Sequence, residues 1–144
     1  MTHLRTILIA GLVLVGSIAH AEVEATDPDV IARQTLMKEM GGAAKALGDM
    51  AGGKTAFDAA AAATAKATIV DHAGQIGAKF EKNPTDPGSE AKPEVWSNWD
   101  DFLKDAKALE VAATALDTAS AETVGAGMAG VGGACKACHT DYRM

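Results

Sequence analysis

Residues 135–139 read Cys-Lys-Ala-Cys-His, and they contain the only two cysteines of the chain. The spacing Cys-x-x-Cys-His is typical of the covalent attachment of a c-type haem. Helix positions three and four apart share a face, so the thiols of Cys135 and Cys138 can both reach one edge of a porphyrin. The His139 imidazole projects from that face toward the iron. The motif therefore predicts one covalently bound haem c with His139 as an axial ligand.

Three other interpretations of the cysteine pair are weaker. A dithiol redox centre normally occurs in a βαβ context, which this sequence does not suggest. A zinc site would need four ligands, and no second pair of cysteines or histidines has suitable spacing. A disulfide between Cys135 and Cys138 would be strained on a helix and would constrain almost none of the chain.

The beginning of the chain predicts export. Residues 1–21 combine basic His3 and Arg5, an apolar run over 7–18 and the ending Ala19-His20-Ala21, as in a cleaved secretory signal peptide. The alternative is an uncleaved anchor, but the apolar run is shorter than the about 20 residues that span a bilayer. We therefore expect a single domain over residues 22–144, located in the periplasm and not inserted in the membrane. Thioether attachment of haem in bacteria is completed on that side of the inner membrane.

The charge of the domain restricts its partners. Cleavage removes Arg5 and no acidic residue, so the domain is more negative than the −6 of the full chain. An acidic balance argues against binding to nucleic acid or to anionic membranes. It suits redox partner proteins that have basic docking surfaces.

Four segments show the 3.6-residue apolar period of amphipathic helices. The first follows the cap and proline of Asp27-Pro28 and ends at Gly52-Gly53. The second begins near Thr55, the third near Pro93 and the fourth near Ser120. The expected apolar stripes are Val30, Met37, Met40, Ala44, Leu47 and Met50 or Ala51; Phe57, Ala61, Ala65, Ile69, His72, Ile76 and Phe80; Trp96, Trp99, Leu103, Ala106, Leu109, Ala113 and Leu116; and Val124, Met128, Val131, Cys135, Cys138 and Tyr142.

These helices predict an all-α fold, an antiparallel up-down-up-down four-helix bundle that carries the haem. Turn-forming residues in the segment 81–92 predict the one long connection. The fourth segment poses a difficulty, because each glycine costs up to about 1 kcal/mol relative to alanine inside a helix. Either the haem needs small residues there, or the helix is frayed or starts late. The glycines are Gly125, Gly127, Gly130, Gly132 and Gly133.

The position of the haem motif narrows the class further. In the mitochondrial type of cytochrome c the motif lies near the N-terminus, whereas here only five residues follow His139. A motif on the last helix of a four-helix chain resembles the cytochrome c′ superfamily, the class II c-type cytochromes. The resemblance extends over residues 22–144, and its specific parts are Arg33-Gln34-x-x-Met37-Lys38-x-Met40-Gly41, Pro93-Glu94-Val95-Trp96 and Cys135-Lys136-Ala137-Cys138-His139-x-x-Tyr142-Arg143.

The resemblance implies roles for the first helix. It implies that Arg33 and Gln34 contact a haem propionate and that Met37 faces the distal side of the iron. Arg33 and Met37 are four positions apart and so share a face. Met40 is the reserve distal candidate. His72 is a further one, although a lone histidine on an apolar stripe is more often a hydrogen-bonded core residue.

The end of the chain and the two tryptophans are expected to play supporting parts. Arg143 should lie on the proximal side of the haem, where it could screen a propionate or shape access to His139. The alternative for Arg143 is a simple cation at a helix C-terminus. Trp96 and Trp99 are expected to be packing anchors between helices.

Two functions follow from the resemblance. The low-spin members have a methionine as sixth ligand and carry single electrons, and the run from Leu36 to Gly41 resembles them more. The high-spin members leave the site open and bind nitric oxide or carbon monoxide, which is the alternative function. An enzyme is not expected, because no acid–base pair is evident for work on a bound oxidant. The resemblance also makes a homodimer possible, through the first two helices.

Overall fold

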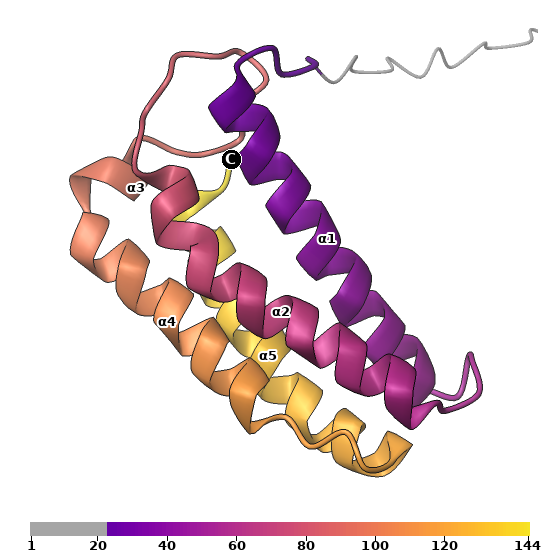
Figure 1. Ribbon diagram of the computed structural model, residues 1–144. Helices are drawn as coiled ribbons and strands as arrows, with labels where there is room; N and C mark the ends of the chain where they lie inside the picture. The colour runs from indigo at the N-terminus through magenta and orange to yellow at the C-terminus, as the bar shows by residue number, and fades with distance from the viewer. Residues whose placement is uncertain (1–22) are drawn as a thin grey trace, which may run out of the picture.

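The protein is described by a computed structural model that covers residues 23–144. The predicted signal peptide, 1–21, lies outside the described residues. The elements in chain order are α1 (Pro28–Ala51), α2 (Ala59–Phe80), the short α3 (Glu94–Ser97), α4 (Trp99–Ala115) and α5 (Ala121–Tyr142). The four long helices form the predicted bundle, with α1 packed on α2 and α5, and α4 packed on the same two helices (Figure 1). Within residues 23–144, no helix is both long and apolar enough to cross a membrane.

The sequence signals locate the starts of α1 and α5 well. The Asp27 side chain caps α1 by accepting a hydrogen bond from the Asp29 amide at 2.9 Å, and Pro28 occupies the first turn. Ser120 and Thr123 form a reciprocal capping box at the start of α5. Both caps satisfy backbone N–H groups that would otherwise lack partners at a helix N-terminus.

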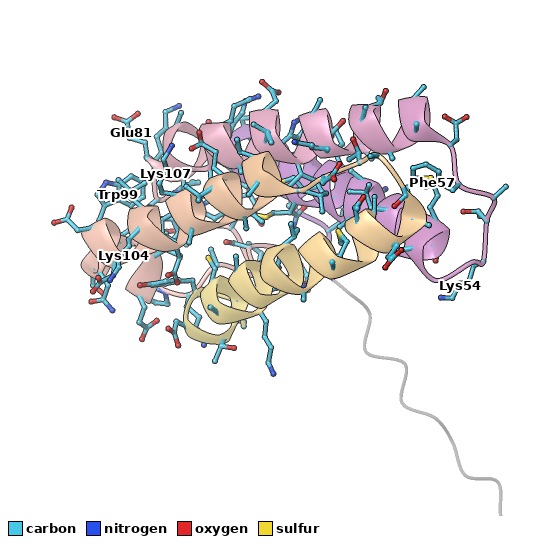
Figure 2. The ribbon with its side chains drawn as sticks, turned by 90° about the horizontal axis from the view of Figure 1, so that it is seen from below. Lys54, Phe57, Glu81, Trp99, Lys104 and Lys107 are labelled. Atoms are coloured by element: carbon cyan, nitrogen blue, oxygen red, sulfur yellow. The ribbon has the colours of Figure 1, made fainter. Side chains whose placement is uncertain are left out.

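The start of the second helix and the continuity of the third differ from the prediction. The second helix begins at Ala59 and not near Thr55, because the Asp58 carboxylate accepts from the Ala61 amide at 2.9 Å and caps it. Phe57 therefore precedes the helix, and Figure 2 shows it with Lys54 in the connection at that end of the bundle. The predicted third helix is interrupted at Asn98, where the backbone leaves the helical region and separates α3 from α4.

The core confirms most of the predicted stripes, but single positions differ in α1, α2 and α4. In α1, Leu36 is buried where Met37 was expected. Ala62 and Ala73 of α2 are buried where Ala61 and His72 were expected, and Phe102 of α4 is buried where Trp99 and Leu103 were expected. The Phe102 ring packs edge-on against Tyr142, with centroids 5.2 Å apart, and at the same distance from Phe80. The buried apolar residues are Val30, Leu36, Met40, Leu47, Met50, Ala62, Ala65, Ile69, Ala73, Ile76, Phe80, Val95, Phe102, Ala106, Leu109, Ala113, Leu116, Val124, Val131 and Tyr142.

The long connection between α2 and α3 is fixed to the start of α1 by one carboxylate. Asp86 is buried and accepts hydrogen bonds from the amides of Thr26 (2.8 Å), Asp27 (2.6 Å) and Gly88 (2.7 Å). These backbone donors hold the pKa of Asp86 below its usual value. At Gly88 a Cβ would lie 2.5 Å from the backbone nitrogen of Ala25, so the two segments cross in direct contact. The connection is thereby held beside the first turns of α1.

The glycine-rich helix is continuous. α5 runs unbroken from Ala121 to Tyr142, so the expectation that it might be frayed or start late is wrong. At Gly127 an added Cβ would overlap the side chain of Leu116, which is almost fully buried. At this glycine, close packing against the end of α4 accounts for the absence of a side chain.

Replacing Gly127 by alanine should therefore destabilise the protein although alanine favours helix. We expect overpacking against Leu116 to lower the free energy of unfolding by about 1–3 kcal/mol. Gly74→Ala in α2 is the control, since a Cβ there has nothing within 4 Å, and it should raise stability by up to about 1 kcal/mol. Urea unfolding of the two holoproteins, followed by circular dichroism, measures both. Equal stabilisation by both substitutions would contradict the packing argument.

Candidate haem site

The two cysteines lie on the same side of α5 and pack partly buried against the core. They form no disulfide with each other. Burial raises the pKa of both, and that of Cys138 rises to about 11 because the carboxylates of Asp105 and Asp141 also disfavour a thiolate nearby. A dithiol redox centre needs the opposite, a lowered thiol pKa. Within residues 23–144, no group of three or more His, Cys, Asp or Glu side chains could hold a metal ion, so zinc finds no support there.

His139 follows Cys138 in the last turn of α5. Desolvation lowers its pKa, the Arg143 guanidinium lowers it further, and Glu90 opposes the shift. The imidazole is therefore neutral at neutral pH and has a free lone pair for a metal ion. Together, the thiols and the imidazole supply the donor set that covalent haem attachment requires.

Arg33 is the unusual residue of the site. Its side chain is buried in α1, with 3% of the residue exposed, and neither Nη1 nor Nη2 has a hydrogen-bond partner within the described residues. The guanidinium lies over the rings of Phe80 and Trp96, 5.1 and 5.4 Å from their centroids. Burial lowers its pKa, and the carboxylates of Asp27, Asp29 and Asp86 oppose that effect.

Such a group fits an anionic ligand. Two buried, unsatisfied N–H groups on a cation cost several kcal/mol unless an acceptor reaches them. A haem propionate is a carboxylate of the kind that guanidinium groups bind with two parallel hydrogen bonds. The buried cation, the two thiols and the imidazole therefore fit the same cofactor.

Gln34 has a definite partner. Its side-chain amide donates to the Gly88 carbonyl at 2.8 Å and so joins α1 to the long connection. With Asp86, which holds the same connection, it forms the surroundings of Arg33. Asp86 was missed by the sequence analysis, which treated Pro87 and Gly88 as turn formers only; an aspartate preceding Pro-Gly was the available signal.

The three distal candidates have different surroundings. Met37 is partly buried and packs against the core, whereas Met40 belongs to the core itself, with 6% exposed. The His72 Nε2 lies 2.5 Å from a Glu39 carboxylate oxygen, and its Nδ1 lies 3.3 Å from Asp71. His72 is thus held in polar contacts between α1 and α2.

The aromatic residues near α3 serve packing, as expected. The Trp96 indole donates to the Phe80 carbonyl at 2.8 Å and closes the end of α2. Trp99 packs on Phe102 with ring centroids 5.6 Å apart. Figure 2 shows Trp99 on the same side of the bundle as Glu81, which follows α2.

Arg143 forms an ion pair with the long connection. Its Nε and Nη2 lie 2.8 and 2.7 Å from a Glu90 carboxylate oxygen. Backbone hydrogen bonds add to this pairing, from the Lys92 amide to the Tyr142 carbonyl and from the Met144 amide to the Glu90 carbonyl, both 2.9 Å. The end of the chain is therefore joined to the connection that also borders Arg33, and Figure 1 shows the C-terminus beside it.

The fold and the site together define a four-helix c-type cytochrome. A family model described as "Cytochrome C'" matches residues 29–143. A cytochrome c-556 of Agrobacterium tumefaciens is 40% identical over 117 residues, covering 78% of this chain and 92% of that protein. A cytochrome c′ of Rhodopseudomonas palustris is 35% identical, covering 97% of this chain and 96% of that protein. The chain belongs to the cytochrome c′ family.

Solved structures agree with this assignment. A cytochrome c′ from Rhodopseudomonas palustris superposes with a TM-score of 0.73 at 29% identity, covering 83% of this chain and 98% of that chain. A nitric oxide complex of a cytochrome c′ variant from Alcaligenes xylosoxidans gives 0.69 at 26% identity, covering 80% and 93%. The protein is thus a monohaem c-type cytochrome that carries one covalent haem, with Cys135 and Cys138 as the expected attachment pair.

Attachment through both thiols is directly testable. Acid–acetone extraction should leave the haem on the polypeptide. Replacing Cys135 or Cys138 by alanine should leave a single thioether or abolish the holoprotein, and His139→Ala should abolish the native absorption spectrum. Two free thiols titrated in denatured protein that still carries haem would contradict the assignment.

The expected contact of Arg33 with a propionate predicts a change of reduction potential. Removing a buried cation favours the more positively charged ferric state, so Arg33→Met should lower the midpoint potential by about 40 mV for each 1 kcal/mol of lost charge interaction. Lys54→Met removes the same charge from the exposed connection at the far end of the bundle and should change the potential little. Spectroelectrochemical titration measures both, and an unchanged potential in Arg33→Met would contradict the propionate contact.

Proposed function

We propose that the protein carries single electrons in the periplasm, with His139 and Met37 as the axial ligands of a low-spin haem. The haem, when bound, supplies a one-electron couple between ferric and ferrous iron. Ligation by histidine and methionine raises the reduction potential of such a haem. The observation that carries the proposal is the placement of Met37 one helical turn after the buried and unsatisfied Arg33.

The geometry of α1 supports Met37 ahead of the other candidates. Arg33 and Met37 share a helix face, so a guanidinium that reaches a propionate places the thioether farther in, above the ring. Met37 is only partly buried, which leaves its flexible thioether free to turn toward a metal. Met40 is already packed into the core, and the Nε2 of His72 faces Glu39.

The surroundings contribute to electron transfer in other ways. In this proposal the Arg33 guanidinium neutralises a haem propionate. The connection between α2 and α3, which Asp86 holds in place, covers the guanidinium end of the site. The aromatic rings of Phe80 and Trp96 keep this region apolar. A rigid and weakly hydrated site changes little when the charge of the iron changes.

The second candidate is a high-spin protein that binds nitric oxide or carbon monoxide, with Met37 crowding an open site. It is favoured by the relatives named cytochrome c′ and by solved structures of two nitric oxide complexes of such a protein. Both candidates are non-enzymatic, and we propose that the protein has no enzyme activity. The relatives named here are cytochromes, which supports this proposal.

Spectroscopy of Met37 variants distinguishes the two candidates. The oxidised wild type should show the weak red charge-transfer band of methionine bound to ferric iron, and its ferrous form should bind carbon monoxide poorly. Met37→Ala should become high-spin. If the unligated state is populated at about 1–10%, emptying the site should raise carbon monoxide affinity about 10- to 100-fold.

The control is Met40→Ala, which removes a thioether one turn farther along α1 and should leave the haem low-spin. A high-spin wild type in which Met37→Ala only speeds gas binding would overturn the proposal in favour of the gas binder. A Met37→Ala protein that stays low-spin would transfer the ligand role to Met40 or His72.

A further inference from the structure

An open cleft of about 610 Å³ lies between the start of α4 and the end of α5, outside the site described above. Four carboxylates line it: Glu94, Asp101, Asp105 and Asp141. Two lysines also line it, but Lys92 donates to the Thr140 carbonyl at 2.8 Å, which leaves Lys104 as the cation without such a bond. The cleft is therefore net negative.

The carboxylates of the cleft, like several others in residues 23–144, have no ion-pair partner there. Elsewhere in residues 23–144, carboxylates such as those of Asp29, Asp49 and Glu90 are paired with a cation. None of the four in the cleft forms an ion pair within the described part of the chain. Carboxylates are favourable in the first turn of a helix, which accounts for the positions of Glu94 and Asp101 but not for those of Asp105 and Asp141.

Asp141 is placed against electrostatic preference, whereas Asp105 is not. Asp105 lies in the second turn of α4, and Asp141 lies in the last turn of α5, where the helix dipole disfavours negative charge. Their carboxylates also raise the pKa of the Cys138 thiol and of the Tyr142 hydroxyl, so they lie close to both groups. Like charges gathered at this point cost stability unless a cation binds there.

Tyr142 supplies an independent sign of a ligand. Only 7% of the residue is exposed, and its ring is held against Phe102. The side chain nevertheless lines the cleft, where its hydroxyl is open to solvent and forms no hydrogen bond to residues 23–144. A buried ring that presents an unpartnered hydroxyl to four carboxylates forms an acceptor site for an N–H donor.

The shape of the cleft decides between a metal ion and a protein side chain. The described residues contain no group of three or more potential ligands close enough to hold a metal ion. An open cleft of this volume instead accommodates the long side chain of a lysine or arginine from another protein. Weak electron-transfer complexes need only a small interface, of less than about 1,200 Å².

We propose that this cleft, bounded by Asp101, Asp105, Asp141 and Tyr142, is the docking site for a redox partner protein with a basic surface. The proposal rests on the electron-carrier function and specifies where the partner binds. A lysine or arginine of the partner enters the cleft and hydrogen-bonds to the carboxylates and the Tyr142 hydroxyl. Docking here places the partner next to Cys138, through which the haem is attached.

The test uses reduced holoprotein mixed with oxidised mitochondrial-type cytochrome c, a basic probe protein, in a stopped-flow instrument at low ionic strength. Asp105→Asn combined with Asp141→Asn should lower the second-order rate constant about fivefold or more and weaken its dependence on salt. Tyr142→Phe keeps the packed ring and should lower the rate constant about twofold. The absorption spectrum of each variant should match the wild type. Loss of two carboxylates near Cys138 should raise the midpoint potential, so the potential of each variant is measured and the rate constants are compared after correction for driving force.

The matched control is Glu81→Gln combined with Glu122→Gln, which changes the net charge equally at two carboxylates outside the cleft. It should leave the rate constant within about twofold of the wild type. An equal fall in both double variants would show a net-charge effect only and would overturn the docking site. An unchanged rate in the Asp105 and Asp141 double variant would overturn it as well.

The outcome is separable from that of the proposed function. Spin state and carbon monoxide binding of the wild type test the Met37 ligation and do not depend on the cleft. The comparison of double variants tests the cleft whatever the spin state, because each variant carries the same haem. A low-spin wild type whose electron-transfer rate does not depend on Asp105 and Asp141 would support the electron-carrier function and refute the docking site.

Discussion

The guanidinium of Arg33 is the constraint on which one end of the bundle depends. A buried cation with two unsatisfied nitrogens lowers the stability of the fold. The surrounding residues offset that cost, although none of them accepts a hydrogen bond from Nη1 or Nη2. The rings of Phe80 and Trp96 offer their negative faces, and the carboxylates of Asp27, Asp29 and Asp86 favour the charged form. This environment retains a positive charge and leaves its donors for a carboxylate that arrives with the cofactor.

The other half of the site depends on a single helix. α5 carries both thiols and the imidazole, so its register fixes all three groups at once. The capping box at Ser120 and the contact of Gly127 with Leu116 set that register at one end, and the packing of Tyr142 on Phe102 sets it at the other. A one-residue shift along α5 would rotate the cysteines away from the core, because adjacent residues on a helix point about 100° apart.

The sequence predicts parts of this structure for identifiable reasons. The caps Asp27 and Ser120 locate α1 and α5, and the haem motif locates the attachment residues. The register of α2 was less predictable, because alanine occupies almost every position of residues 59–67 and the periodic signal is weak there. In α4, Phe102 is buried because its ring packs against the rings of Phe80 and Tyr142. Both of these residues lie far from Phe102 in the sequence, so no local pattern indicates the contact. The role of Asp86 depends on backbone donors some 60 positions away, which no local pattern reveals.

The pairing of the chain end with the α2–α3 connection has a consequence for biogenesis. Contacts of Tyr142, Arg143 and Met144 with residues 90–92 form only after residues 142–144 have been synthesised. The packing of α1 on α5 likewise joins the two ends of the chain. Closure of the bundle is therefore a late, non-local event, and helices α1, α2 and α4 are synthesised before it. Until then the two thiols are not enclosed by the fold, which gives the apparatus that forms the thioether bonds a period of access to them.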